Sequence, residues 1–439
     1  EPSRRKKNHR IESSPFIRET TSRIKAIPLF LHNWDAPTIP NPITPPSIEQ
    51  IKQIAKTQKA TLVQYSVIYD DLKGRGKPQA LESKVYIWVI KPTGEVTFRQ
   101  ADLATALKQR NISLAELVSS SRESIGVRGR GLGLVKRVDD ALQKTQLQQL
   151  YNLLIQPIAD LLPTNPESRV IFIPHQSLFL VPFAALQDQD GQYLIEKHTL
   201  LTTPSIQVLD LTHKQRQKIQ QTASDNAVIV GISRKAVVVG NPTMPKVPPK
   251  IGEQPQPLKP LPGAEEEAKA IADVLKTQAL TGKQATKAAV MQQMSGARII
   301  HLATHGLLED LGETGVPGAI ALAPSGNDNG LLSAREVLNM NLNAELVVLS
   351  ACDTGRGRLT GDGVIGLSRA FISAGSPSLV VSLWKVSDEA TAFLMPEFYR
   401  QLSSNPNKAV ALRIAMLATM KKYPNPRDWA AFTLIGEAE

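Results

Sequence analysis

Apolar residues follow different patterns in the first and second parts of the chain. In the first part, β-branched and aromatic residues concentrate in short segments, and Gly94 supplies a turn between two of them. This composition predicts strands that are joined as a hairpin or meander, followed by helices. The strands expected here are 61–70, 84–91 and 95–99, and the expected helices are 101–121 and 136–162.

From Arg169 onward, short apolar segments alternate with segments of helical periodicity. Segments such as 298–303 and 345–351 are almost continuously apolar, which is typical of strands that helices cover on both faces. The alternation predicts an α/β fold with a mainly parallel sheet. The expected strands are 169–173, 236–240, 298–303, 345–351 and 378–383, and the expected helices are 263–276, 285–294, 362–374, 387–403 and 406–422.

Two proline-rich segments interrupt these patterns. Residues 36–47 hold five prolines, which favour a stiff linker. Residues 241–262 hold eight, which favour an exposed loop. We therefore divide the chain into a basic, Pro-rich arm and linker (1–47), an N-terminal subdomain of strands and helices (48–135) and a C-terminal α/β domain (136–439).

The composition is that of a globular protein with an uneven charge. Hydrophobic residues make up 42% of the 439 residues and charged residues 21%, so a packed core is expected. The formal net charge is +11, and residues 1–25 hold eight Lys and Arg against three Glu without any periodicity. We interpret this segment as a solvated, disordered arm. A nucleic-acid contact is the alternative, but no binding module accompanies the segment, so nucleic acid is not an expected partner.

The cysteine count and the lengths of the apolar segments limit the disulfides, metal clusters and membrane contacts that are expected for this chain. A single cysteine excludes an intramolecular disulfide and any Cys-based metal cluster within one chain, and it favours a cytoplasmic location. No apolar segment approaches the ~20 residues that span a bilayer, so no membrane contact is expected. The chain begins with Glu1 rather than Met, which leaves open that it is a fragment.

Reactive groups stand at the ends of two predicted strands. One strand is followed by His305 and Gly306, and another by Cys352, the only cysteine. In open parallel sheets, reactive groups gather beyond the carboxyl ends of the strands. The 47-residue separation of His305 and Cys352 allows one crossover that places the two strands side by side.

This arrangement suits nucleophilic catalysis. An imidazole can take the proton of a nearby thiol, and the resulting thiolate is the better nucleophile. The same imidazole then protonates the leaving amine. We therefore predict His305 as the base, Cys352 as the nucleophile, and the backbone N–H groups of Gly306 and Cys352 as donors to the oxyanion.

Each of these residues also has an ordinary structural interpretation. A lone cysteine at a strand end is often a small buried apolar residue, and a lone histidine is often hydrogen-bonded in a loop. His301 and His305 have the spacing of two metal ligands on a helix, but this segment has the pattern of a strand and a turn, and no third ligand is evident. We expect no metal site, and we interpret His301 as buried in its strand.

Several motifs, in order along the chain, resemble the core of a CHAT domain. The resemblance runs from about residue 140 to residue 436, and more loosely from residue 60. The motifs are His-Leu-Ala-Thr-His-Gly (301–306), Leu-Ser-Ala-Cys-Asp-Thr-Gly (349–355), Gly-Asp-Gly-Val-Ile-Gly-Leu-Ser-Arg-Ala-Phe (361–371), Ser-Leu-Trp-Lys-Val-Ser-Asp-Glu-Ala-Thr (382–391) and Trp-Ala-Ala-Phe-Thr-Leu-Ile-Gly (429–436). CHAT domains are caspase-like cysteine peptidases that are related to separase and often attached to tetratricopeptide arrays. We find no such array in this sequence.

The resemblance implies a caspase-like α/β/α sandwich with a central, mostly parallel sheet of about six strands, plus an N-terminal β-rich subdomain. It implies a cysteine endopeptidase that hydrolyses protein substrates through His305 and Cys352 without any cofactor, in regulated proteolysis or programmed cell death. The substrate would lie as an added strand along residues 380–385. A non-catalytic interaction or scaffold module with the same fold is the alternative, and a regulatory protein partner is a further expectation.

The resemblance also implies a specificity pocket, formed by Asp353, Trp384, Lys385 and Asp388. Asp388 would favour Lys or Arg before the scissile bond, and Lys385 would favour an acidic residue there. The structural alternatives are an N-terminal helix cap for Asp388, a solvated Lys385 and a core position for Trp384. Residues 48–135 carry no reactive pair, so they are either an inactive companion subdomain or strands that extend the main sheet.

Overall fold

The computed structural model describes most of the chain. The described residues are 45–72, 79–108, 112–127, 140–227, 236–248, 253–307, 318–350, 361–384 and 387–439. The chain divides into two units, Glu1–Ile48 and Glu49–Glu439, and the sheet described below belongs to the second. Within the described ranges, no helix has the length and apolar character needed to cross a membrane.

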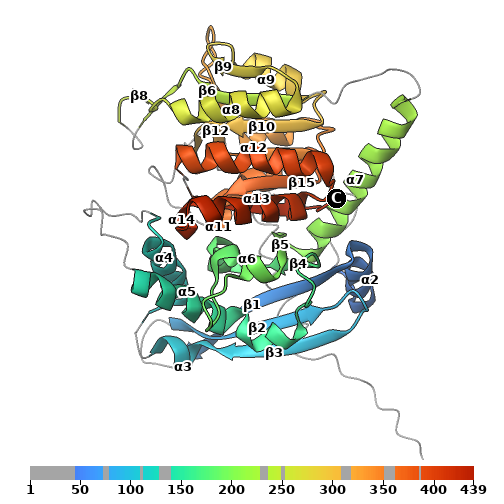
Figure 1. Ribbon diagram of the computed structural model, residues 1–439, viewed down its shortest axis with the longest axis vertical. Helices are drawn as coiled ribbons and strands as arrows, with labels where there is room; N and C mark the ends of the chain where they lie inside the picture. The colour runs from blue at the N-terminus through green and yellow to red at the C-terminus, as the bar shows by residue number, and fades with distance from the viewer. Residues whose placement is uncertain are drawn as a thin grey trace, which may run out of the picture. The chain divides into compact units, whose positions relative to one another are not determined.

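One sheet of eleven strands forms the centre of the second unit (Figure 1). Its order is β3-β2-β1-β4-β5-β16-β15-β14-β10-β6-β9. The strands are β1 (Ala60–Leu72), β2 (Gln79–Ile90), β3 (Val96–Asp102), β4 (Arg169–Ile173), β5 (Thr199–Thr202), β6 (Ala236–Pro242), β9 (Ala279–Gly282), β10 (Ile299–Ala303), β14 (Leu346–Leu349), β15 (Ser378–Ser382) and β16 (Phe432–Gly436). Two small sheets accompany it: β7 (Lys246–Val247) with β8 (Gln256–Pro257), and β11 (Gly306–Leu307) with β12 (Ala319–Ala321) and β13 (Leu331–Ser333).

The large sheet consists of two halves. In the C-terminal half, β9, β6, β10, β14 and β15 are parallel, and β16 is antiparallel to them. This half confirms the expected mostly parallel sheet of about six strands. In the N-terminal half, β5, β4 and β1 run parallel to β16, and β2 and β3 complete an antiparallel meander. The N-terminal strands therefore extend the main sheet, while the predicted boundary at residue 135 lies outside the described residues.

Helices cover both faces of the sheet, as the continuous apolar segments predicted. On one face, α8, α12 and α13 lie side by side and pack on residues such as Val238 and Val348 (Figure 1). On the other face, α9, α10 and α11 pack on Val239 and Val347. The helices are α2 (Ile48–Gln58), α3 (Leu103–Lys108), α4 (Leu114–Ser124), α5 (Asp140–Leu154), α6 (Leu194–Lys197), α7 (Ile206–Ala227), α8 (Pro262–Leu275), α9 (Lys287–Met294), α10 (Ala334–Leu338), α11 (Gly361–Ser373), α12 (Asp388–Ser404), α13 (Lys408–Lys422) and α14 (Pro426–Trp429).

Two predicted helices are shorter than the sequence pattern indicated. The segment 101–121 holds α3 and the first part of α4, and α4 begins after Ser113, whose side chain forms a capping box with Glu116. The segment 136–162 holds α5, which ends at Leu154 and is followed by a 3₁₀ helix, Gln156–Leu161. Pro157 lacks the N–H that a continuing α-helix requires, so the chain changes its hydrogen-bonding pattern there.

Several elements were missed by the sequence prediction. The longest is α7, whose start is marked by Ser205, since the Ser205 hydroxyl accepts a hydrogen bond from the Val208 N–H. The strands β5, β9 and β16 have only four or five residues, which is too short for their periodicity to stand out. The proline-rich segment 241–262 contains β7 and β8 in addition to loop.

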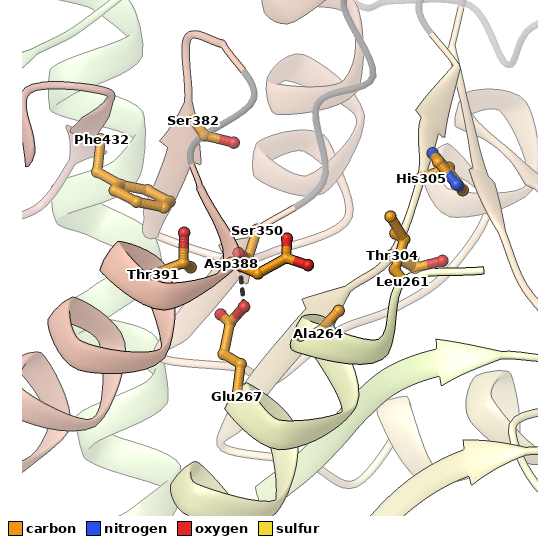
Figure 2. Close-up of a pocket in the computed structure, with 11 residues that line it drawn as sticks. Leu261, Ala264, Glu267, Thr304, His305, Ser350, Ser382, Asp388, Thr391 and Phe432 are labelled. Carbon is orange, nitrogen blue, oxygen red and sulfur yellow. Dashed lines mark hydrogen bonds between the residues drawn. The ribbon is translucent and has the colours of Figure 1, made fainter. Parts of the chain in front are cut away.

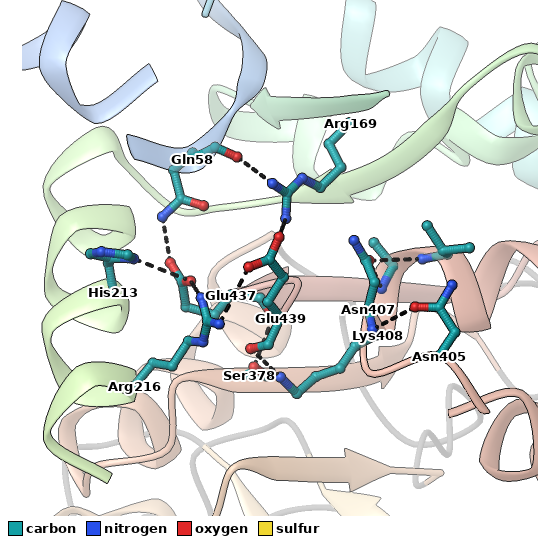
Figure 3. A network of polar contacts seen from close by, with 12 residues as sticks. Gln58, Arg169, His213, Arg216, Ser378, Asn405, Asn407, Lys408, Glu437 and Glu439 are labelled. Carbon is teal, nitrogen blue, oxygen red and sulfur yellow. Dashed lines mark hydrogen bonds and ion pairs between the residues drawn. The ribbon is translucent and has the colours of Figure 1, made fainter. Parts of the chain in front are cut away.

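A buried polar network joins the two halves at the amino end of β15 (Figure 3). Glu437 is 2% exposed and accepts a 2.5 Å hydrogen bond from the Gln58 side chain. His213 and Arg216 of α7 lie 3.4 and 3.6 Å from the same carboxylate. Arg169 of β4 donates to the Gln58 carbonyl at 2.6 Å. The network therefore connects the end of α2 to the C-terminal segment through the middle of the sheet.

Candidate active site

A recess opens beyond the carboxyl ends of β10, β14 and β15, where the sequence placed the reactive groups. We call it the strand-end recess (Figure 2). Its empty volume is about 480 Å³, which includes space open to solvent. The described residues that line it are Leu261, Gly263, Ala264, Glu267, Thr304, His305, Ser350, Ser382, Asp388, Thr391 and Phe432.

His305 lies at the side of this recess and is 4% exposed. Its Nε2 is 2.8 Å from the carbonyl oxygen of Lys259. Because a carbonyl only accepts, Nε2 carries the hydrogen in the neutral ring, and Nδ1 carries the lone pair. The His305 carbonyl accepts from the Ala321 N–H at 2.9 Å. The backbone and the ring are thus both fixed, and Nδ1 is the basic atom.

Cys352 and Asp353 lie outside the described residues, but the strand that precedes them is described. β14 pairs with β10 in a register that sets Leu302 opposite Leu349. Ser350 follows this strand directly and lines the strand-end recess. The offset between paired residues is 47 positions, the same as the separation of His305 and Cys352.

Beneath the recess lies a buried polar chain of four side chains. Glu267 of α8 is 3% exposed, and its two oxygens lie 2.9 Å from His301 Nε2 and 3.2 Å from the Ser350 hydroxyl. His301 Nδ1 is 3.1 Å from the Tyr399 hydroxyl. Burial, together with the charge of Glu267, raises the pKa of Tyr399, so its hydroxyl stays protonated. The chain therefore runs in one direction, from the Tyr399 O–H through the imidazole to the carboxylate.

Sequence reasoning placed His301 inside its strand but did not single out Glu267. The available signal was helical spacing. Glu267 stands three residues after Ala264 and four before Ile271, on the face of α8 that packs on the sheet. Among the three consecutive glutamates 265–267, the helical spacing predicts burial for Glu267.

Asp388 is the first residue of α12 and lines the recess. The N-terminal cap of this helix is Ser387, whose side chain accepts from the Ala390 N–H, and not Asp388. Figure 2 shows the Asp388 carboxyl group directed into the recess. With Glu267, two carboxylates line the recess, and no Lys or Arg is among its described lining. The recess therefore has an acidic character.

The remaining predicted residues have different surroundings. The Trp384 indole is 1% exposed, donates to the Arg427 carbonyl at 2.9 Å, and is not part of the described lining. Lys385 lies outside the described residues. Gly306 begins β11 and pairs with Ile320 of β12. The structure thus brings His305 and Asp388 to one recess and places Trp384 in the core.

The predicted substrate strand, residues 380–385, is occupied on both edges for most of its length. β15 pairs with β14 on one side as far as Val381 and with β16 on the other as far as Ser382. The Leu383 N–H donates to the Ala431 carbonyl at 2.8 Å. The edge toward β16 is therefore occupied as far as Leu383.

Within the described ranges, no group of three or more His, Cys, Asp or Glu side chains is arranged to hold a metal ion.

The fold and the recess define an α/β/α protein with a large, mostly parallel central sheet. The family model of the CHAT domain matches residues 144–437, so the chain belongs to the CHAT family, as its motifs indicated. The chain is similar to tetratricopeptide repeat protein 28, at 30% identity, from Mus musculus over 70% of this chain and from Homo sapiens over 74%. It spans only 14% of the length of either relative. Among solved structures, it is similar to the Saccharomyces cerevisiae separase–securin complex, at 10% identity and a TM-score of 0.46, over 88% of this chain and 30% of that one.

Proposed function

We propose that this chain is a cysteine endopeptidase that uses His305 and Cys352. The main support is His305, held at the carboxyl end of β10 by its bond to Lys259, with the strand that leads to Cys352 directly beside it. Paired residues of these strands are 47 positions apart, which is also the separation of His305 and Cys352. A base and its nucleophile need to come within hydrogen-bond reach of each other, and neighbouring strand ends favour this.

In the proposed reaction, Nδ1 of His305 takes the proton of the Cys352 thiol. The sulfur then bonds to the substrate carbonyl carbon, and the backbone N–H groups of Gly306 and Cys352 donate to the oxyanion. As the C–N bond breaks, the imidazolium returns its proton to the leaving amine. Water then hydrolyses the thioester, again with His305 as the base, and the thiol is restored.

The acidic recess supports a basic side chain before the scissile bond. Asp388 and Glu267 supply negative charge there, and Asp388 is accessible to solvent, whereas Glu267 is held by His301 and Ser350. A lysine or arginine of the substrate would pair with Asp388. The peptide backbone would pair as a short added strand at the end of the predicted segment 380–385, beyond its pairing with β14 and β16. Asp353 and Lys385 stay candidates for further contacts to the substrate.

The test uses the single thiol, because every alkylation reports on Cys352. We expect iodoacetamide to alkylate Cys352 at neutral pH, with a rate that titrates below the ordinary thiol pKa of ~8.5. His305→Gln should slow alkylation at pH 7 about tenfold or more, because the imidazolium no longer stabilises the thiolate. His213→Gln, which changes a histidine of the network at the amino end of β15, is the matched control and should leave the rate unchanged.

Cleavage is measured on a peptide library with the same proteins. Cys352→Ala should reduce cleavage at least ~10³-fold while the unfolding midpoint is retained, and Lys or Arg should be preferred over Asp or Glu before the cleaved bond. Unchanged cleavage in folded Cys352→Ala would overturn the proposal. An unreactive thiol together with an absence of cleavage would favour the non-catalytic interaction module.

A further inference from the structure

Arg122 is a buried charge outside the strand-end recess, and its contacts connect distant parts of the chain. It belongs to α4 in the N-terminal part of the chain and is 6% exposed. One terminal nitrogen donates to the Leu383 carbonyl at 2.8 Å, across 261 residues of sequence. The other donates to the Leu180 carbonyl at 3.1 Å. A helix of the N-terminal half therefore contacts the segment that follows β15.

The aromatic ring next to this carbonyl adds a third contact. The Arg122 guanidinium lies 5.3 Å from the centre of the Trp384 ring, within the range of a cation–π interaction. Arginine suits this place, because its planar group can donate to two carbonyls in different directions while its face meets an aromatic ring. An ammonium group has neither the planar face nor the same span. The geometry is thus specific for arginine.

The segment is held from its other side as well. The Leu383 N–H donates to the Ala431 carbonyl, and the Trp384 indole donates to the Arg427 carbonyl. The Ser387 hydroxyl, a few residues on, donates to the Asp428 carboxylate at 3.1 Å. Residues 383–384 are therefore clamped between α4 on one side and the α14–β16 region on the other.

This clamped segment connects two sides of the strand-end recess. Ser382, just before it, and Asp388, just after it, both line the recess. A change in the conformation of residues 383–384 would move these groups together, whereas His305 follows the end of β10 and would stay in place.

We propose that Arg122 is a positioning residue: it fixes residues 383–384, and through them the substrate-binding side of the recess. The N-terminal part of the chain thereby takes part in substrate binding in addition to extending the sheet. This inference rests on the proposed peptidase function. It assigns Arg122 to peptide binding and not to the reactivity of the thiol.

The test compares Arg122→Lys, which keeps the charge, and Arg122→Met, which removes it, with wild type. Arg99→Met is the matched control, because Arg99 is an arginine of the same half in a partly exposed pair, 3.5 Å from Asp160. For an extended peptide, we expect both Arg122 variants to raise KM about tenfold or more, with a smaller change in kcat. The rate of Cys352 alkylation by iodoacetamide should stay within about twofold, and Arg99→Met should resemble wild type.

Hydrogen exchange of residues 382–388 supplies a measurement that does not need turnover. We expect faster exchange there in Arg122→Lys than in wild type, with unchanged exchange in β10. Normal KM and normal exchange in folded Arg122→Lys would overturn the inference. Equal losses of alkylation and cleavage would also overturn it, because they would indicate a general structural role. If the wild-type protein neither cleaves peptides nor is alkylated at Cys352, the peptidase proposal fails. Unchanged hydrogen exchange at 382–388 in Arg122→Lys would then still contradict the positioning role of Arg122.

Discussion

At the scale of residues, the central feature is Glu267 beneath the strand-end recess. A buried carboxylate is costly unless its oxygens accept hydrogen bonds. Here His301 and Ser350 donate to its two oxygens, and Ser350 lies two residues before Cys352. The carboxylate therefore fixes the end of β14 relative to α8. It also maintains His301 as the Nε2–H tautomer.

Glu267→Gln should destabilise the protein by about 1–3 kcal/mol, because the single amide oxygen can accept from only one of His301 and Ser350, and the amide nitrogen can accept from neither. Urea unfolding followed by circular dichroism gives this difference. The matched control is Glu266→Gln, one position earlier on the exposed side of the same helix, which should change stability by less than about 0.5 kcal/mol. Equal stabilities of the two variants would contradict the role assigned to this carboxylate.

The sequence was sufficient to single out His305 and Asp388, which both line the recess, because each stands at a boundary between elements in a recognisable motif. Their roles in catalysis and substrate binding stay predictions. The sequence was not sufficient for Arg122. Whether an arginine near a helix end is solvated or buried depends on which distant carbonyls approach it, and Leu383 is 261 positions away. The core position of Trp384 was likewise decided by its partner Arg427.

At the scale of elements, the recess depends on the close approach between the first turns of α8 and α12. Gly263 stands at the start of α8, and a Cβ built on it would lie 2.2 Å from the Cβ of Asp388, the first residue of α12. Real atoms do not approach this closely, so the absence of a side chain at Gly263 permits the contact. The position of Asp388 in the recess follows from this contact.

Gly263→Ala should therefore destabilise the protein by about 1–3 kcal/mol, because the new methyl group forces α8 and α12 apart. In an ordinary helix, the same change stabilises by up to ~1 kcal/mol, so the sign itself is informative. Gly296→Ala is the control, since a Cβ there meets no atom within 4 Å. Thermal or urea unfolding measures both, and a gain of stability in Gly263→Ala would show that the helices can separate freely.

At the scale of the whole molecule, the two halves of the sheet share one folded unit, and a buried histidine lies where they meet. His198 follows α6, immediately precedes β5, and is 8% exposed. Burial, assisted by the positive charges of Lys197 and Arg413, lowers the pKa of His198 from 6.5 to about 4. Within the described structure, its Nδ1 has no hydrogen-bond partner, so a second proton on the ring would lack an acceptor.

The stability of the protein should therefore fall with acidification between pH 6.5 and pH 4. In this window, the unfolded chain binds a proton at His198 and the folded chain does not, so protons favour unfolding. His198→Gln keeps an N–H for the Pro163 carbonyl and removes this dependence. The difference in the free energy of unfolding between wild type and His198→Gln should change by up to about 3 kcal/mol from pH 7 to pH 4. Urea unfolding at several pH values measures this difference. Equal losses of stability on acidification in wild type and His198→Gln would contradict the assignment of this pH dependence to His198.

The sequence by itself determined the parallel strands with their covering helices, the family and the two strand ends that carry the candidate chemistry. These depend on local periodicity and on short motifs, which are written in neighbouring residues. The tertiary structure alone decided that the N-terminal strands continue the same sheet, that Glu267 and His301 are paired below the recess, and that Arg122 reaches the segment beside it. These features depend on contacts between residues far apart in sequence, and the physical cost of burying a charge is settled only when its distant partners are in place.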